Sequence, residues 1–294
     1  MKVSVIIVCF RAYQELADCL VSVDGQSRPP AEVIVVDQAG APGELGVIAG
    51  RFPRVTFIEV VENKGFAGGV NLGAQRATGD GLLVLNPDCV LEPTALGELA
   101  GWLQHHPGVG IVGPRIRNSD GSRQASARRF PDWTTGIAGR RSWLSRVLPA
   151  NRLSRGNLLS QEIGDDPVRV DWVSGACFLV RREAFDAVGG FDPGFFLYWE
   201  DADFCRRLVN AGWQTWHHPG PEVTHAVGRS SRRMPVRALV AFHRSAFRYY
   251  WKHGSVLARA LAPIAAGLLV ARLGALLAAA RLVHLRPGRG SPGK

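Results

Sequence analysis

Short apolar runs alternate with helical patterns through the N-terminal part of the chain, and this alternation constrains the fold more than any other feature. Four runs rich in β-branched or long aliphatic side chains are typical of strands, at residues 3–9, 32–36, 55–61 and 82–85. The helical spacing of Leu16, Leu20 and Val23 predicts a helix after the first run, and another follows at residues 66–77. This order indicates βαβ units around a parallel sheet that is covered on both faces. We therefore expect an α/β fold.

The later part of the chain continues these patterns less regularly. Helices are predicted at residues 93–105, 181–188, 199–208 and 235–253, and strands at 109–113 and 174–180. Two further short strands flank Pro219-Gly220-Pro221. Residues 115–170 show no sustained period, and a segment of this length is usually functional or mobile. We expect one domain over residues 1–233, a helical extension over 234–286 and a disordered tail over 287–294.

The charge of the chain favours an anionic partner. The formal net charge is +10 and the isoelectric point is about 10.0. Phosphates, a nucleic acid or an acidic membrane surface are the partners that such an excess attracts. Nucleic acid is disfavoured, because the sequence has no zinc-finger spacing, RNP signature or basic-aromatic platform.

Cysteine usage indicates a reducing compartment. The five cysteines are odd in number, widely spaced and form no C-x-x-C motif: Cys9, Cys19, Cys89, Cys177 and Cys205. We expect them to be reduced thiols in a cytosolic chain rather than a disulfide framework. The first apolar run ends at Arg11 without a cleavage-like site, so it predicts a strand and not a signal peptide.

The C-terminal apolar segment is ambiguous between a membrane-associated and a packed helix. Residues 260–280 contain only Arg272 as a charged residue and are long enough to span a bilayer. An arginine at mid-segment costs about 3 kcal/mol or more in hydrocarbon. Arg259, Arg272 and Arg281 do not share one helical face, which argues against an interfacial amphipathic helix. We expect residues 240–286 to associate with the cytoplasmic membrane face, and the alternative is a helical hairpin packed on the domain.

Acidic residues follow the predicted strands where a parallel sheet would bind a ligand. The run at residues 82–85 ends in Asn86-Pro87-Asp88, and Pro87 stops the ladder because it has no N–H to donate. Asp88 is thus placed at the C-terminal end of a central strand, the ligand-binding edge of open α/β sheets. Asp37 ends the second strand in the same way. For both residues the alternative is a turn or capping role.

Two later positions add chemistry to this set. Asp201 begins a predicted helix, where it is either a general base or a favourable charge at the helix dipole. Asp88 can bind a divalent cation through its carboxylate oxygens. His225 can join it as a ligand through a neutral ring nitrogen, although a lone histidine is more often structural.

In combination, these positions resemble the family 2 inverting glycosyltransferases of GT-A fold, particularly the bacterial rhamnosyltransferase-like members. The matching segments follow the family's order over residues 3–230: 3–10, 32–37, 62–71, 85–88, 175–180 and 189–207. The resemblance implies a Rossmann-like, mostly parallel sheet with flanking helices, which forms a catalytic domain over residues 1–233. Residues 234–286 lie outside these segments, and their apolar composition is what predicts a membrane-associating helical extension.

The resemblance implies a role for each matched residue. Asp37 matches the acid that contacts the nucleotide base, and Asp201 the catalytic base. Asp88 matches the metal ligand of the D-x-D site, and His225 a later metal-ligating histidine. Asn86 replaces the first Asp of that site and is expected to touch ribose rather than metal. Residues 37–40 also depart from the usual Asp-Asn-x-Ser, which leaves base contacts beyond Asp37 unassigned.

Two wider sets of contacts follow from the same likeness. The nucleotide and donor side comprises Cys9, Phe10, Asp37, Asn63, Gly65, Phe66, Asn71, Asn86, Asp88 and Arg129. The acceptor side comprises Gly175, Ala176, Trp199 and Glu200. Arg128 is a further candidate for binding phosphate, and the alternative is that it belongs to a solvated basic loop. Trp172 and Tyr198 offer flat apolar faces for a sugar, and the alternative is that they are ordinary core aromatics.

The predicted function is that of a glycosyltransferase at the cytoplasmic face of the plasma membrane, dependent on Mg²⁺ or Mn²⁺. The resemblance favours L-rhamnose from dTDP-rhamnose as donor and a lipid-linked or polysaccharide acceptor. A different donor such as a UDP-linked galactofuranose is the nearest alternative. A catalytically silent nucleotide-sugar-binding scaffold is the alternative outside enzymes.

Overall fold

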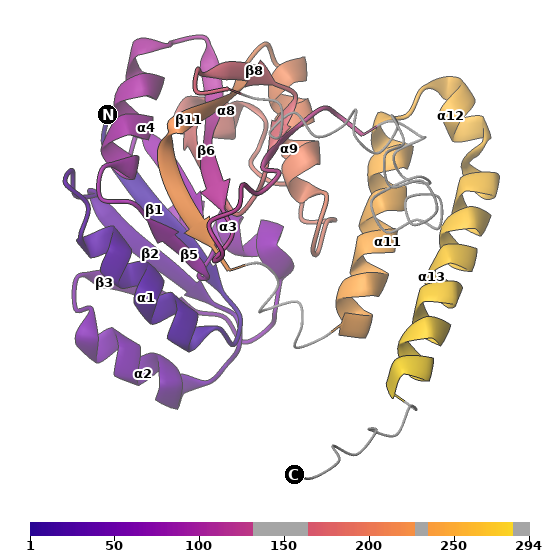
Figure 1. The fold of residues 1–294 in the computed structure, drawn as a ribbon, viewed down its shortest axis with the longest axis horizontal. Coiled ribbons are helices and arrows are strands. Elements are labelled where there is room, and N and C mark those ends of the chain that lie inside the picture. Colours follow the sequence, from indigo (N-terminus) through magenta and orange to yellow (C-terminus); the bar gives the residue numbers. More distant parts are fainter. Residues whose placement is uncertain (132–163, 227–234, 285–294) are drawn as a thin grey trace, which may run out of the picture.

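The computed structural model describes residues 1–131, 164–226 and 235–284, which form an α/β domain and a C-terminal helical part (Figure 1). In Figure 1 a twisted sheet lies between layers of helices, and the C-terminal helices, coloured orange to yellow, stand to one side. All five cysteines belong to the described part of the α/β domain, where they are buried and form no disulfide. This agrees with the reduced thiols that their spacing predicts.

The main sheet has nine strands: β1 (Val3–Cys9), β2 (Glu32–Asp37), β3 (Val55–Glu59), β4 (Gly81–Leu85), β5 (Cys89–Leu91), β6 (Val109–Arg117), β8 (Val168–Val170), β10 (Cys177–Arg181) and β11 (Gln214–His225). Their spatial order is β3-β2-β1-β4-β10-β6-β11-β5, and β8 pairs with β11 off this path. The first four strands are parallel, as the alternation predicts. Because β10 runs antiparallel to both β4 and β6, the complete sheet is mixed. A separate ribbon pairs β7 (Ala127–Arg128) with β9 (Trp172–Val173).

Helices cover both faces of the sheet. One face carries α1 (Tyr13–Asp24), α2 (Pro42–Arg51) and α4 (Ala95–His105), and the other carries α3 (Gly65–Arg76), α8 (Arg182–Ala187) and α9 (Glu200–Asn210). Strand β1 shows why: Val5 and Ile7 enter one core cluster, whereas Ile6 and Val8 enter the other. Every residue of β1 and β4 is buried, which is the pattern of central strands with helices on both sides.

The C-terminal part consists of α11 (Pro235–His253), α12 (Val256–Ala260) and α13 (Ala262–His284), with α11 and α13 side by side (Figure 1). Helix α11 docks on the α/β domain, where Ser245 Oγ donates a hydrogen bond of 3.0 Å to the Leu197 carbonyl. Several large apolar side chains of α12 and α13 remain exposed. Within the described residues, no helix combines the length and apolar composition that a membrane crossing requires.

Some elements differ from their sequence predictions. Helix α2 and strand β5 were not predicted from the sequence. Helix α2 is rich in glycine, and the three residues of β5 are too few to show the alternation of a strand. The two short strands expected around Pro219-Gly220-Pro221 are one strand, β11, whose register shifts between His218 and Glu222. The region expected to be irregular contains β7 and β8. Its residues 132–163, and the predicted tail at 287–294, lie outside the described residues.

Candidate active site

Asp88 and His225 meet at one edge of the sheet because β5 pairs antiparallel with β11, which places His225 opposite Cys89. His225 Nε2 lies 3.2 Å from Asp88 Oδ1. The other ring nitrogen, Nδ1, lies 2.9 Å from Gln124 Oε1, and the Gln124 amide nitrogen donates to Asn118 at 3.3 Å. Because Gln124 Oε1 only accepts, Nδ1 carries a proton, and Nε2 is the ring nitrogen that faces the Asp88 carboxylate.

In the neutral tautomer with its proton on Nδ1, His225 presents the Nε2 lone pair to the carboxylate, and a cation between the two atoms would be attracted to both. The carboxylate oxygen and imidazole nitrogen suit a divalent ion such as Mn²⁺, with the remaining positions open to other oxygen ligands. Cys89 completes the only triplet of this kind among the described residues, its ligand atoms lying within 4.8 Å of one another. Its thiol donates to the Ala176 carbonyl at 3.3 Å, and burial raises the pKa of Cys89 well above the usual value. Asp88 and His225 therefore fit a metal, whereas Cys89 stays a thiol.

Asp37 lies at the C-terminal end of β2, beside Cys9 in the parallel register. Tyr13 Oη donates to Asp37 Oδ2 at 2.9 Å, and the Ala39 N–H donates to Oδ1 at 3.3 Å. Burial raises the pKa of Asp37 above its usual range, although these hydrogen bonds act in the opposite direction. The carboxylate is thus held in a fixed orientation near the end of the strand.

The loop before α3 is shaped by Gly65 and held by Gln38. Gly65 has φ of +73°, and a Cβ at this position would lie 2.1 Å from the Phe196 carbonyl oxygen. Its N–H donates to Asn63 Oδ1 at 2.8 Å. The Gln38 amide donates to the Gly65 carbonyl at 3.0 Å and accepts from the Lys64 N–H at 2.7 Å. This close backbone approach requires glycine.

Asn71 lies further along α3, where the Phe191 backbone contacts both ends of its side-chain amide. Its Nδ2 donates to the Phe191 carbonyl at 2.8 Å, and its Oδ1 accepts from the Phe191 N–H at 2.9 Å. Asn71 therefore fixes the turn that precedes α9.

Asp201 occupies the first turn of α9, a helix that begins directly after two residues in a strained backbone conformation. Tyr198 and Trp199 both have φ of 69°, in the left-handed region that bulky side chains rarely adopt. The Gly175 N–H donates to Asp201 Oδ2 at 2.9 Å, and the Ala202 N–H donates to Oδ1 at 2.8 Å. A methyl group on Gly175 would lie 3.4 Å from the Phe66 ring and 3.6 Å from Asp201. Gly175 thus separates the loop at Phe66 from the Asp201 carboxylate.

Burial shifts the pKa values of the neighbouring carboxyl groups of Glu200 and Asp201 in the same direction. Burial raises the pKa of Asp201 above its usual range, against the lowering effect of hydrogen bonds and of the Arg128 charge. Burial and the adjacent Asp201 charge raise the pKa of Glu200 to about 8. Glu200 Oε2 is buried and has no hydrogen-bond partner within the described chain. Burial thus disfavours the ionised form of both adjacent carboxyl groups, and the Arg128 charge and two backbone N–H groups favour ionisation at Asp201.

Arg128 contributes positive charge beside Asp201 from strand β7. Its guanidinium lies 5.0 Å from the centre of the Trp172 ring and donates to the Ala125 carbonyl at 3.1 Å. Arg129 is exposed, and its carbonyl accepts a hydrogen bond of 2.9 Å from Trp172 Nε1. Of the two arginines, Arg128 is the one whose charge acts on the candidate base.

The candidate residues gather at one edge of the sheet, although they come from distant segments. The edge holds the C-terminal ends of β1, β2 and β4. Because β10 is antiparallel to β4, the preceding Gly175 and Ala176 reach the same edge, where the Asn86 N–H donates to the Ala176 carbonyl at 2.8 Å. Phe10 continues β1 there and is half-buried.

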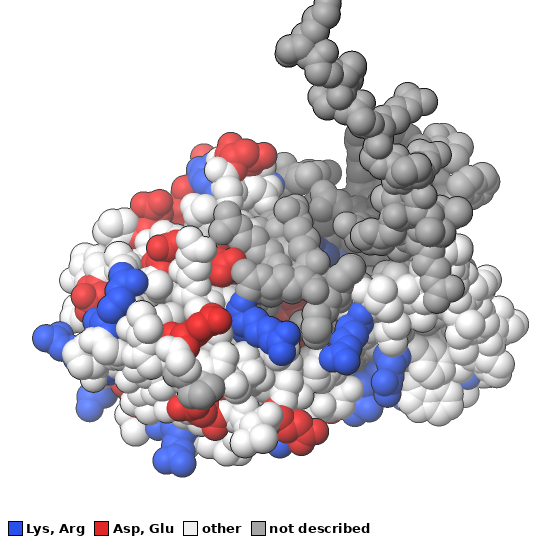
Figure 2. All heavy atoms as spheres, turned by 90° about the horizontal axis from the view of Figure 1, so that it is seen from below, with Lys and Arg blue, Asp and Glu red and all other residues white. Residues whose placement is uncertain are grey.

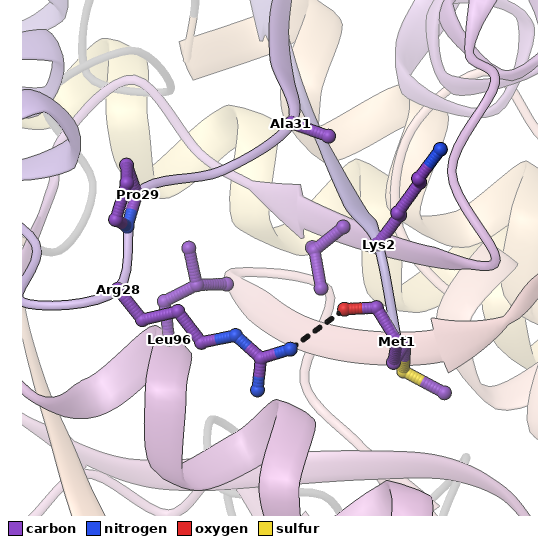
Figure 3. Close-up of a pocket in the computed structure, with 7 residues that line it drawn as sticks. Met1, Lys2, Arg28, Pro29, Ala31 and Leu96 are labelled. Carbon is purple, nitrogen blue, oxygen red and sulfur yellow. Dashed lines mark hydrogen bonds between the residues drawn. The ribbon is translucent and has the colours of Figure 1, made fainter.

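A small cavity of about 180 Å³ lies at the opposite edge of the sheet (Figure 3). It is lined by Met1, Lys2, Val3, Arg28, Pro29, Ala31 and Leu96, and Arg28 closes it with a hydrogen bond of 2.9 Å to the Met1 carbonyl. These residues precede β1 and β2, whereas Asp37 and Asp88 follow β2 and β4. The cavity is therefore separate from the candidate active site.

A comparison with known families identifies the chain. The family model described as Glycosyl transferase family 2 matches residues 4–189. The chain belongs to glycosyl transferase family 2. This family 2 glycosyltransferase is 32% identical over 254 residues to the N-acetylglucosaminyl-diphospho-decaprenol L-rhamnosyltransferase of Mycobacterium tuberculosis, which covers 83% of this chain and 82% of the relative.

Solved glycosyltransferase structures share the fold. GalNAc-T7 with UDP, GalNAc and Mn²⁺ has a TM-score of 0.59 at 18% identity, covering 77% of this chain and 44% of that chain. This protein thus spans less than half of the GalNAc-T7 chain. The mannosyltransferase PcManGT from Pyrobaculum calidifontis, in complex with GDP-Man and Mn²⁺, has a TM-score of 0.57 at 19% identity over 97% of this chain and 80% of that chain. These likenesses confirm the predicted GT-A type of α/β fold.

Some polar contacts of this glycosyltransferase were not predicted. Tyr13 and Gln38 bind Asp37 and the Gly65 loop, respectively. Gln38 directly follows Asp37 in the sequence. The departure of residues 37–40 from the usual Asp-Asn-x-Ser was the one sequence feature that pointed to a special role for Gln38. Gln124, which sets the His225 tautomer, comes from a region without periodicity and left no signal.

Proposed function

We propose that this family 2 enzyme is a metal-dependent, inverting transferase that moves L-rhamnose from dTDP-rhamnose to a hydroxyl of a lipid-linked or cell-envelope polysaccharide acceptor. The observation that carries this proposal is the gathering of Asp37, the Asp88–His225 pair and Asp201 at one sheet edge. The mycobacterial relative, named as an L-rhamnosyltransferase on a diphospho-decaprenol acceptor, supports the donor and the acceptor class.

In this proposal Asp201 is the general base. Its ionised carboxylate takes the proton of the acceptor hydroxyl while that oxygen attacks the anomeric carbon from the face opposite the diphosphate. The new C–O bond forms as the bond to the diphosphate breaks, so the configuration inverts in one displacement. The Gly175 and Ala202 N–H groups keep the carboxylate in place during the transfer.

The diphosphate leaving group gathers negative charge as the bond breaks. A divalent cation, Mg²⁺ or Mn²⁺, held by Asp88 and His225 would supply Lewis-acid stabilisation of that charge. In this proposal Arg128, whose charge acts on Asp201, and the exposed Arg129 add positive charge for the diphosphate. The protonated Glu200 leaves the site with one fewer negative charge facing an anionic donor.

The remaining residues divide between donor and acceptor. Asp37 accepts hydrogen bonds from the nucleotide base in this proposal, and Asn86 contacts the ribose. The wider donor side is built by Cys9, Phe10, Asn63, Gly65, Phe66 and Asn71, with Asn71 acting through the turn at Phe191. Gly175, Ala176, Trp199 and Glu200 are assigned to the acceptor side in this proposal, and Gly175 lies between Phe66 and Asp201.

We further propose peripheral association with the cytoplasmic face of the plasma membrane. The exposed apolar side chains of α12 and α13 support it, as does the acceptor named for the mycobacterial relative. A lipid-linked acceptor keeps its reactive sugar near the membrane surface, so an enzyme that acts on it gains from residence there.

Calorimetric binding and hydrolysis of a panel of nucleotide sugars test the donor. With Mn²⁺ or Mg²⁺ present, dTDP-rhamnose should bind more tightly than UDP-galactofuranose, UDP-glucose and GDP-mannose, and a chelator should weaken binding. The Asp201→Asn variant is the control for turnover, since it should bind donor without hydrolysing it. Preference for a UDP sugar would refute the rhamnose assignment, and binding of none of them would refute the transferase proposal.

A further inference from the structure

A hollow outside the active site lies where the end of α11, helix α12 and the turn before α9 meet. It encloses about 360 Å³ and is lined by Asp192, Arg248, Trp251, Lys252 and Arg259. Three of these five side chains are cationic and one is a carboxylate. The hollow is therefore basic, and none of its residues belongs to the donor or metal site.

The cations of the hollow are held in place by specific contacts. Arg248 lies 3.0 and 3.1 Å from the two Asp192 carboxylate oxygens, and Lys252 Nζ lies 2.7 Å from Asp192 Oδ2. Arg259 Nε and Nη2 donate to the carbonyls of Trp251 and Lys252 at 3.1 and 3.3 Å. These carbonyls belong to the last turn of α11, so the Arg259 guanidinium is ordered without a carboxylate partner in those contacts. Its positive charge remains available to an anion.

Trp251, which lines the hollow, and large apolar side chains close to its lining residues in the sequence are exposed to solvent. Trp251 at the end of α11 is 53% exposed, and Val256 and Leu257 of α12 are 85% and 71% exposed. Leu261 and Ile264 continue this apolar surface into the start of α13. Figure 2 shows the molecule from below, where the C-terminal part, at the right, exposes mostly uncharged side chains with Lys and Arg beside the α/β domain. A solvated surface with this many exposed aliphatic residues is unusual for a monomer.

We propose that the hollow binds the phosphate headgroup of an anionic membrane lipid while Trp251, Val256 and Leu257 enter the membrane surface. Arginine guanidinium groups match phosphate oxygens in charge and geometry. Tryptophan favours the boundary between headgroups and acyl chains, and aliphatic side chains favour the layer beneath it. The juxtaposition of a basic hollow and an apolar surface therefore fits one occupant, a lipid bilayer with negative headgroups.

This inference rests on the proposed membrane-surface role and adds a specific lipid site to it. Lys252 links the site to the catalytic helix, because its Nζ lies 2.7 Å from Asp192 and 2.8 Å from Asp203 of α9. A phosphate in the hollow would thus lie one side chain away from the helix that begins with Glu200 and Asp201.

Sedimentation of the full-length protein with vesicles tests the site. Wild type should bind vesicles of phosphatidylcholine with about one-third phosphatidylglycerol more tightly than pure phosphatidylcholine. Arg259→Gln should weaken binding to the anionic vesicles about five-fold and leave binding to the neutral ones unchanged. Leu257→Ser should weaken binding to both. A matched control is Arg237→Gln, which removes the same charge from the exposed start of α11, outside the hollow.

The outcomes separate the alternatives. Equal losses for Arg237→Gln and Arg259→Gln would show general electrostatic attraction and refute the headgroup site. A dimer that dissociates with Leu257→Ser, without vesicle binding, would assign the apolar surface to a second copy of the chain and overturn the proposal. Donor binding is measured by calorimetry in parallel. A protein that binds the donor but does not bind vesicles would refute the lipid site and leave the transferase proposal unaffected.

Discussion

His253 Nε2 lies 2.7 Å from Asp203 Oδ1, and this contact joins the C-terminal helix α11 to the helix that carries Asp201. Lys252 Nζ reaches the same oxygen at 2.8 Å, and Arg207 Nε reaches Oδ2 at 2.8 Å. The Trp199 ring, in its strained conformation, packs against Phe242 and Tyr249 of α11. Helix α11 is thus a structural part of the catalytic unit and not only a connection to α13.

Replacement of Asp203 should destabilise the protein in a pH-dependent way. Burial would raise the pKa of Asp203, but hydrogen bonds from His253 and Lys252 and the charge of Arg207 lower it to about 2. A lowered folded-state pKa stabilises the native state above the ordinary value near 4, and the contribution is lost as pH falls toward 2. Asp203→Asn should therefore lose about 2 kcal/mol or more of unfolding free energy at pH 7 in urea titrations.

The control for this variant is Asp186→Asn. Asp186 is exposed and lies 3.9 Å from Arg182, so its replacement should change the free energy of unfolding by less than about 0.5 kcal/mol. A loss for Asp203→Asn that stayed constant down to pH 2 would contradict the assignment of the pKa.

Replacement of Asp201 should separate donor binding from transfer. Asp201→Asn keeps the shape of the side chain and removes the proton acceptor, so transfer should fall by about 100-fold to 10,000-fold. The dissociation constant of the donor should change little, because the base acts on the acceptor hydroxyl. Single-turnover transfer and donor calorimetry measure the two quantities, and near-wild-type turnover would exclude Asp201 as the base.

The pH profile of kcat/KM should be bell-shaped. Activity requires ionised Asp201, whose raised pKa places the ascending limb above the usual range of an aspartate. Activity should fall again as Glu200 ionises, with a pKa of about 8, because a second negative charge repels the anionic donor. Glu200→Gln should flatten the descending limb and preserve the ascending one. Loss of the ascending limb instead would reverse the roles of the two carboxyl groups.

Removal of the Asp88 carboxylate should abolish metal-dependent donor binding. Asp88→Ala leaves His225 as the single ligand, so the donor should bind at least about 100-fold more weakly in Mn²⁺ and show no further loss with a chelator. Cys89→Ala is the matched control, since its thiol donates to the Ala176 carbonyl and is not expected to bind metal. A similar loss in both variants would indicate that the thiol, too, is a ligand.

Gly65 should not tolerate a side chain. Gly65→Ala forces a Cβ against the Phe196 carbonyl at a positive φ, so it should cost more than about 1 kcal/mol of stability and weaken donor binding. Gly46→Ala, in the exposed middle of α2 with open space around its Cβ, should raise stability by about 0.5–1 kcal/mol. Thermal unfolding and donor calorimetry of the two variants check this contrast. Equal stability of both would contradict the steric account of the loop.

The sequence predicted the elements whose local pattern is strong. Strands β1 and β4 are buried on both faces, and their continuous aliphatic composition predicts this burial. Helix α2 shows the limit: only Leu45 and Ile48 face the core, and three glycines weaken the helical pattern. The register shift within β11 depends on pairing with β6, a contact between segments about a hundred residues apart.

The residues of the candidate site also differ in how well the local sequence pattern predicts them. Acidic residues that end strands can be found from sequence, because parallel strands bring their C-terminal ends to one edge. The hydrogen bonds from Tyr13 to Asp37 and from Gly175 to Asp201 depend on how helices and loops pack, which no local pattern records. The same holds for the positive φ at Tyr198 and Trp199, since tertiary contacts with α11 hold that strain.

The burial of every cysteine has a practical consequence for fluorescence labelling. Each thiol lies within the α/β domain, and burial raises the pKa of four of them, at Cys19, Cys89, Cys177 and Cys205. Maleimide dyes react with accessible thiolates, so the native protein should resist modification while it is folded. A single cysteine introduced on α12 would then carry a dye without prior removal of the native thiols, and its emission would report the distance between that helix and a bilayer directly.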